Sequence, residues 1–317
     1  MVHSVFPTWM WVVFALTVIS MLVLDLGVFQ RKAHAPSARE AGVWVAVWVA
    51  LALLFNLGIY FKLGEKTALE FLTGYVIEEA LSVDNLFVFF IIFGYFAVPG
   101  HLQHRALFWG IVGAVVIRGA FIFVGTSLMN AFHWMIYLFG GFLIFTGIKI
   151  LFGSDSKVDP EKNPALRLAR KLVPLSKDYV GQKFFARVDG RLLATPLFLV
   201  LVVIETTDIV FAVDSIPAVM AVTTDPLVIF TSNIFAILGL RSMYFLLSRV
   251  IDKFRYLKVG LGVVLAFVGT KMVIADWVHI PVQASLGVVV GVLLLAALAS
   301  AWIKPKPEQP APTGSES

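Results

Sequence analysis

Nine long apolar runs divide this sequence, and they limit the fold more strictly than any other feature. Each run holds about 20 residues or more, the length at which an α-helix crosses the hydrocarbon core of a bilayer. The runs fall at about 9–29, 41–61, 69–96, 104–126, 132–152, 195–221, 226–248, 256–276 and 282–303. Hydrophobic residues make up 59% of the chain and charged residues 14%, whereas soluble domains have about 25% charged residues. We therefore predict an all-α, polytopic membrane protein with nine transmembrane helices in a single transmembrane domain, residues 1–303.

The distribution of Lys and Arg predicts the orientation of this domain. Nineteen of the 25 basic residues lie in the first, third, fifth and seventh loops and in the tail, and only Lys62 and Lys66 lie in the other loops. Because basic residues mark the cytoplasmic side of a membrane protein, we expect the N-terminus outside and the C-terminus in the cytoplasm.

The largest cytoplasmic segment is the basic loop 153–194. Its stretch 163–173 has the pattern of a short basic amphipathic helix at the inner surface. Residues from Phe184 to Leu193 predict a hairpin that turns at Asp189-Gly190. The tail 304–317 is rich in proline and polar residues, so we expect it to be disordered.

Two segments of the chain, 69–152 and 195–276, resemble one another. Val83-Asp84-Asn85 align with Val213-Asp214-Ser215, and Glu78 then aligns with Asp208. Further matched positions are Arg118 near Arg241, and Leu143, Phe145, Gly147 and Lys149 with Leu265, Phe267, Gly269 and Lys271. Each copy holds three spans, so the first starts outside and the second inside. We therefore predict a three-plus-three inverted repeat, an arrangement typical of transporters with a site at the repeat interface.

Acidic residues inside the spans are the candidate functional groups, because each ionised carboxylate at the bilayer centre costs about 2.5 kcal/mol or more unless paired or solvated. They are Asp25, Glu78, Glu79, Asp84, Glu205, Asp208 and Asp214. We interpret Asp25, near Arg31, as an interfacial charge. The other six lie in the first span of each repeat copy. Four bases within spans, Arg118, Lys149, Arg241 and Lys271, cannot neutralise six acids, and Lys149 and Lys271 lie near span ends where they can reach the interface.

This surplus of buried carboxylates predicts a cation site rather than a purely structural set of ion pairs. The available donors are oxygens, since the chain has no Cys and its six His lie in loops or at span ends. Oxygen ligands suit Mg²⁺, Ca²⁺ or Mn²⁺, and the residues alone do not separate these three. The predicted metal ligands are Glu78, Asp84, Asn85, Glu205, Asp208, Asp214 and Ser215. Arg118 and Arg241 are either counter-charges that occupy the acids when the cation leaves or parts of structural salt bridges.

Helix geometry sets a condition on a shared site. Glu205 and Asp208 are three residues apart and share a face, whereas Asp208 and Asp214 are about 120° apart in a straight helix. For all of them to face one site, the helices must kink or unwind near the Asp residues. Pro217 favours this in the sixth span, because it cannot donate a hydrogen bond to the Val213 carbonyl. The alternative is that Pro217 makes a plain packing kink.

The motifs around these acids resemble those of the TerC family, and among its members the Alx-type bacterial branch. The resemblance rests on Gly74-Tyr75-Val76-Ile77-Glu78, on Leu81-Ser82-Val83-Asp84-Asn85, on Phe211-Ala212-Val213-Asp214-Ser215-Ile216-Pro217 after Glu205 and Asp208, and on Thr231 to Arg241. It extends from the first span to the ninth. It implies an inner-membrane protein of the LysE-like transporter superfamily, manganese export, and older links to tellurite resistance. The residues it implicates are Glu78, Asp84, Glu205, Asp208 and Asp214, without Glu79.

From these features we predict a divalent cation exporter, with Mn²⁺ as transported substrate, alternating access, and protons as counter-ion. One alternative is a membrane factor that metallates or assists exported proteins without net transport, and another is a Ca²⁺ exchanger. The chain lacks the motifs of hydrolases, zinc proteases and nucleotide-binding enzymes, so we expect neither an enzyme nor a prosthetic group. The expected partners are the lipid bilayer and the metal ion, with no nucleic acid. The sequence indicates no oligomeric state.

Overall fold

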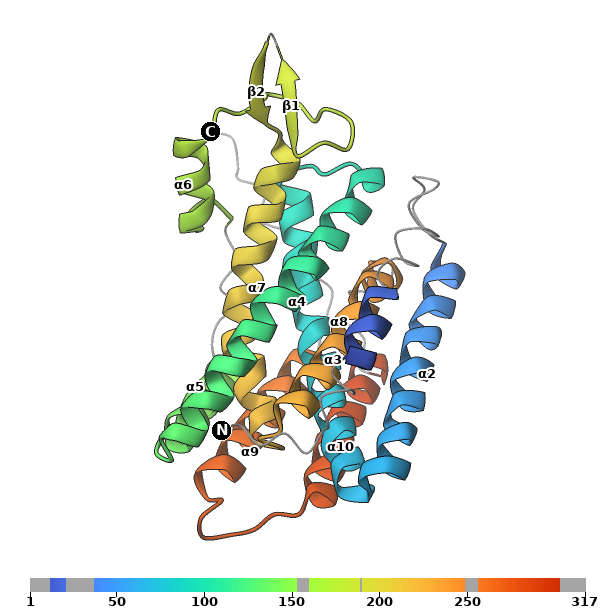
Figure 1. Cartoon of the computed structure of the whole chain (residues 1–317), viewed down its shortest axis with the longest axis vertical. Helices are drawn as coiled ribbons and strands as arrows, with labels where there is room; N and C mark the ends of the chain where they lie inside the picture. The colour runs from blue at the N-terminus through green and yellow to red at the C-terminus, as the bar shows by residue number, and fades with distance from the viewer. Residues whose placement is uncertain (1–11, 21–36, 153–159, 189, 249–255, 303–317) are drawn as a thin grey trace, which may run out of the picture.

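A computed structural model describes residues 12–20, 37–152, 160–188, 190–248 and 256–302, and these form a bundle of long helices (Figure 1). Residues 12–20 are helical. The long helices that follow are α2 (Ala38–Leu63), α3 (Glu65–Tyr95), α4 (Gly100–Ala131), α5 (Met135–Phe152), α7 (Pro196–Met220), α8 (Pro226–Leu247), α9 (Leu257–Val273) and α10 (Val282–Trp302). Asp25, Arg31 and the tail 304–317 lie outside the described residues.

Six of the described helices are long and apolar enough to cross a membrane: α2, α4, α5, α7, α8 and α10. Helix α9 is shorter, with 17 residues, and α3 carries several acids along its 31 residues. The predicted helical, membrane-embedded class is therefore confirmed, while the crossing of the bilayer by nine helices stays a prediction.

A polar residue followed by proline precedes two of the helices, but its side chain caps only one of them. Asp225 accepts hydrogen bonds from the backbone N–H groups of Leu227 (2.8 Å) and Val228 (3.3 Å), with Pro226 in the first turn of α8. Thr195 precedes Pro196 in the same way, but its hydroxyl makes no cap. It donates instead to the Lys183 carbonyl at 2.7 Å, and so ties the start of α7 to the preceding loop.

Helix α8 forms the centre of the bundle. In its most apolar stretch 89% of the residues are buried, against 17% in α2 and in α10. It packs against α2, α3 and α4, while α4 also packs on α7 and α3 on α7. Thus α3, α4, α7 and α8 enclose the interior, and α2 and α10 present their apolar side chains outward.

Helices α5 and α9 approach one another unusually closely, at two pairs of glycines. A Cβ atom added to Gly269 would lie 2.7 Å from the Gly140 carbonyl oxygen, and one added to Gly147 would lie 2.7 Å from the Gly262 carbonyl oxygen. Small residues permit such backbone contact between membrane helices. In the repeat alignment Gly147 corresponds to Gly269, and Gly140 corresponds to Gly262. The Gly140–Gly269 contact and the Gly147–Gly262 contact are therefore equivalent when the two repeat segments are exchanged.

The basic loop between α5 and α7 forms a cap on one end of the bundle, which we call the hairpin end (Figure 1). Strand β1 (Phe185–Val188) pairs antiparallel with β2 (Arg191–Ala194), and α6 spans Pro164–Leu172 after the short helix η1 (Pro160–Lys162). Both the predicted hairpin and the predicted basic helix are therefore confirmed.

Side-chain contacts hold this cap against the bundle. The Asn163 amide donates to the Thr206 hydroxyl of α7 at 2.9 Å. The Tyr179 hydroxyl donates to the Phe96 carbonyl at 2.8 Å, and burial raises the pKa of Tyr179 to about 12. The loop is consequently packed on the end of α3 and on the side of α7.

Candidate functional site

A buried arginine joins the two repeat segments in the interior of the bundle. Arg118 of α4 has no solvent exposure. Its Nη1 donates to Glu78 of α3, and its Nε and Nη2 donate to Asp208 of α7 at 3.3 Å and 3.0 Å. Its Nη1 also donates to the Asn233 side-chain oxygen of α8 at 3.1 Å. Glu78 and Asp208, which the sequence aligns with each other, thus meet on one guanidinium.

This Arg118 cluster, made of Arg118, Glu78, Asp208 and Asn233, carries two carboxylates against one guanidinium. Glu78 is fully buried and Asp208 is 6% exposed. If all three groups are ionised, a single negative charge remains in a low-dielectric interior, where an unbalanced charge is costly. The cluster therefore suits one further positive charge or a proton.

Several buried polar atoms of α3, α7 and α8, the helices that carry Glu78, Asp208 and Asn233, make no hydrogen bond with other described residues. They are Glu78 Oε2, Ser82 Oγ, Asn85 Nδ2, Ser215 Oγ and Asn233 Nδ2. Buried polar groups in proteins are almost always satisfied, by protein, water or an ion. Asn85 and Ser215 also occupy aligned positions of the two repeat segments. The interior between α3, α7 and α8 thus has the polar atoms expected of a hydrated or ion-binding site.

Glu205 lies one helical turn before Asp208 on α7, and its carboxylate lies against Gly113 of α4. The absence of a side chain at Gly113 makes room for it. Its Oε2 is buried and makes no hydrogen bond with the described residues. Glu205 is therefore a carboxylate close to the Arg118 cluster but outside it.

The Asp214 side chain points toward α5 and not toward the α4 side of α7, where Glu205 and Asp208 lie. It accepts a hydrogen bond from the Thr146 hydroxyl of α5 at 3.3 Å. Asp84 lies in α3, but its side chain is outside what the structure describes. Arg241 is 3% exposed on α8, and Lys149 is exposed on α5.

The helices that carry the acids do not unwind. Both α3 and α7 are α-helical throughout, with Pro217 accommodated inside α7. This is why Glu205 and Asp208 face α4 while Asp214 faces α5. Among the described side chains, no three His, Asp or Glu come together as a metal site. The structure thus brings Glu78 and Asp208 together and leaves Glu205 and Asp214 apart from them.

Asn233 is the member of the cluster that sequence reasoning missed as a ligand. It is fully buried, and its side-chain oxygen completes the set of acceptors around Arg118. An uncharged amide escapes a search for charges inside apolar spans. The signal that could have found it is its place in Thr231-Ser232-Asn233, a run of polar residues inside an apolar span.

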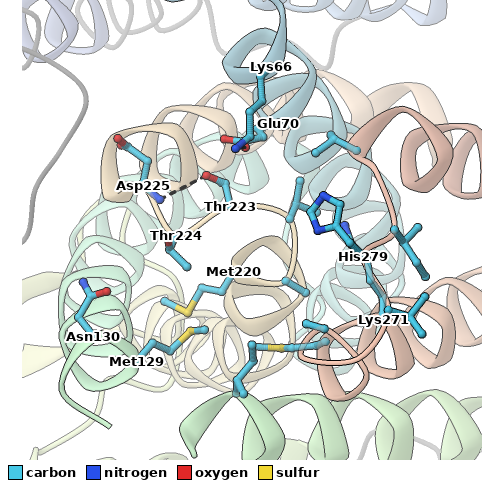
Figure 2. A pocket seen from close by; sticks show the side chains of 18 residues that line it. Lys66, Glu70, Met129, Asn130, Met220, Thr223, Thr224, Asp225, Lys271 and His279 are labelled. Atoms are coloured by element: carbon cyan, nitrogen blue, oxygen red, sulfur yellow. Dashed lines mark hydrogen bonds and ion pairs between the residues drawn. The ribbon is translucent and has the colours of Figure 1, made fainter. Parts of the chain in front are cut away.

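A cavity of about 740 Å³ opens at the end of the bundle opposite the hairpin (Figure 2). We call it the vestibule. Its charged and ring-nitrogen groups are Lys66, Glu70, Asp225, Lys271 and His279, and Met129, Met220 and Met272 line its wall. Neither Glu78 nor Asp208 lines it, so the Arg118 cluster is closed off from this cavity.

The cluster is also closed toward the hairpin end. Phe89, Leu107, Ile204 and Leu240 pack beside Arg118 and Asp208 around a space of only about 10 Å³. That volume is at the lower limit for a single water molecule. Among the described residues, neither of these two cavities therefore gives solvent wide access to the buried charges.

Long apolar helices that enclose buried charges define an integral membrane protein. The chain belongs to the TerC family of integral membrane proteins, whose characteristic sequence matches residues 63–308. It is 52% identical to the uncharacterized membrane protein STKORF319 of Myxococcus xanthus over 92% of this chain and 91% of the relative. It is 46% identical to a protein of Escherichia coli K12, over 93% and 94% of the two chains, whose name proposes a membrane-bound redox modulator, Alx. No solved structure is significantly similar to the chain.

Proposed function

We propose that this protein exports Mn²⁺ across the bacterial inner membrane by alternating access through the carboxylates of α3 and α7. The observation that carries the proposal is the convergence of Glu78 and Asp208, from aligned positions of two segments, on one fully buried cation, Arg118. Two carboxylates and an amide oxygen from three helices are donors suited to a hard divalent cation. Resemblance to the TerC family favours Mn²⁺ among such ions.

The proposed architecture is nine transmembrane helices with an inverted repeat, the N-terminus outside and the C-terminus in the cytoplasm. The reciprocal glycine contacts of α5 with α9 support the repeat, since a twofold axis relates contact i–j to contact j–i. In this orientation the vestibule faces outside and supplies the exit route, while the hairpin end faces the cytoplasm.

Asp84, Asn85, Glu205, Asp214 and Ser215 complete the proposed set of cargo ligands. In the occluded arrangement Asp214 is directed to Thr146, so a change of helix packing accompanies its engagement with the cation. Buried carboxylates readily take up protons, and proton exchange on these acids supplies the counter-ion in the proposal.

Reconstituted vesicles test the proposal directly. Purified protein in vesicles loaded with a Mn²⁺-sensitive dye should carry Mn²⁺, and Glu78→Gln and Asp208→Asn should reduce the flux to the rate of empty vesicles. Glu65→Gln is the matched control, because Glu65 is an exposed acid on the same helix as Glu78. Wild-type flux in both site variants would refute the proposal.

Two other functions have distinct outcomes in the same assay. Ca²⁺ flux that Mn²⁺ does not inhibit would indicate a Ca²⁺ exchanger. Absence of any metal flux, together with co-purification of an exported metalloprotein, would indicate a metallation factor. A redox role, as the relatives' name proposes, could not use thiols of this chain, because it contains no Cys.

A further inference from the structure

Arg118 occupies the position at which three oxygen-bearing side chains from α3, α7 and α8 converge. It is fully buried and holds Glu78, Asp208 and Asn233 at once. An arginine stays protonated at any physiological pH, so it is a permanent positive charge at this point. The oxygens it holds are the same ones that the proposed function assigns to the cargo.

Charge excludes the simultaneous presence of Arg118 and a divalent cation among these oxygens. With Arg118 alone the cluster carries one negative charge, and with a divalent cation alone it is neutral. Both together would leave a net positive charge and force two cations to share buried acceptors, which is costly in a low-dielectric interior. Binding of the cargo therefore requires the guanidinium to leave.

The next acid along α7 from Asp208 toward the hairpin end is Glu205. Glu205 precedes Asp208 by three residues on α7, which is a shift of about 4.5 Å along the helix axis. Its carboxylate lies against Gly113 of α4, five residues before Arg118 on the same helix. Its Oε2 is buried without a hydrogen bond among the described residues, so this oxygen is available to a buried donor.

We propose that Arg118 competes with the transported cation for Glu78 and Asp208. When the cation binds, Arg118 moves one turn along α7 to Glu205 and so leaves Glu78 and Asp208 to the cation. This inference rests on the proposed function. It makes Arg118 a positioning residue and gives Glu205 the role of its second partner, in place of the cargo-ligand role that the proposed function assigns to it. The guanidinium returns to Glu78 and Asp208 when the cation leaves.

Mn²⁺ binding to purified protein tests the proposal, measured through the loss of the free Mn²⁺ electron paramagnetic resonance signal. Arg118→Gln should bind Mn²⁺ at least about tenfold more tightly than wild type, because the competitor is gone, and should transport more slowly. Lys149→Gln is the matched control: it also removes a positive charge from a helix, but Lys149 is exposed, and its affinity should stay that of wild type. Unchanged or weaker affinity in Arg118→Gln would overturn the proposal.

If Arg118→Gln does not fold, Arg118→Lys provides the same test of the competition between residue 118 and Mn²⁺. A lysine keeps the charge but cannot hold two carboxylates with a planar fork, so it should compete less and raise Mn²⁺ affinity by a smaller factor. Affinity at or below that of wild type in the folded variant overturns the proposal as well.

A double-mutant cycle separates the assigned role of Glu205 from that of a direct ligand. Glu205→Gln should weaken Mn²⁺ binding in wild type, where Arg118 loses its second partner. It should have no effect in the Arg118→Gln background and a smaller effect in the Arg118→Lys background than in wild type. Equal weakening in both backgrounds would refute the movement to Glu205. Absence of Mn²⁺ binding in wild type and in every variant would refute the proposed function itself, whereas normal wild-type binding without tighter variants refutes only the inference.

Discussion

Arg118 shows how a single side chain can determine the chemistry of a membrane interior. A guanidinium in this position is stable only because two carboxylates and an amide oxygen surround it. Removing one partner of a buried ion pair typically costs about 3–5 kcal/mol.

Glu161 gives a pH-dependent prediction at the surface of the cap. Hydrogen bonds from Tyr95 and Arg170 lower the pKa of Glu161 from its ordinary value of 4.5. Because the folded pKa is the lower one, the contribution of Glu161 to stability is present above pH 4.5 and is lost as the pH falls through the lowered pKa. We expect faster hydrogen exchange in α6 below that pKa, after correction for intrinsic rates.

Glu161→Gln should show the faster exchange of α6 already at neutral pH and should abolish its acid dependence. Asp178→Asn is the control, since Asp178 is an exposed acid of the same loop. Acid-induced exchange that persists in Glu161→Gln would contradict the assignment.

At the scale of single residues, the sequence predicted the charged members of the Arg118 cluster but not Asn233, its uncharged member. Glu78, Asp208 and Arg118 stand out because charges inside apolar spans are rare. Which acids would meet was not readable, because it depends on how α4 and α7 rotate against each other. Asn233 carries no charge, and no acid stands beside it in the sequence as Asp84 stands beside Asn85.

The contact of α5 with α9 yields a prediction at the scale of elements. Gly269→Ala would place a Cβ atom 2.7 Å from the Gly140 carbonyl oxygen, and overpacking of this kind costs about 1–3 kcal/mol. We expect a lower melting temperature in detergent for Gly269→Ala. The control is Gly141→Ala on α5, where a Cβ atom would meet nothing within 4 Å. Equal melting temperatures of the two variants would contradict the close contact.

The sequence predicted where the helices begin and end better than it predicted whether they are distorted. Run length and the Asp225-Pro226 cap locate α8 to within a residue or two. By contrast, Pro217 and the 120° offset of the acids suggested distortion, and α7 nevertheless stays α-helical. The loss of one backbone hydrogen bond near a helix end is small beside the packing of Ile216, Ala218 and Val219, all of which are buried.

The orientation of the whole molecule can be tested with cysteine chemistry, because the chain contains no Cys. Asn130→Cys introduces a thiol at the vestibule, and Lys177→Cys introduces one in the exposed loop of the hairpin end. We expect a membrane-impermeant maleimide to label Asn130→Cys in intact cells and Lys177→Cys only after permeabilisation. The reverse pattern would overturn the N-outside topology, and the wild-type chain, which cannot be labelled, is the control.

The closed Arg118 cluster also bears on the energy supply of a cell that holds such a protein in its membrane. Two unpaired carboxylates inside a membrane protein could bind protons or sodium ions during passage across the bilayer. Each ion that crossed in this way would dissipate part of the electrochemical gradient. A guanidinium cannot give up its proton there, and it offsets one of the two negative charges that would attract monovalent cations. If the protein transports cations as we propose, the fully buried arginine reduces this leak while no cargo is bound, and a cell can then hold many copies of the protein in its membrane.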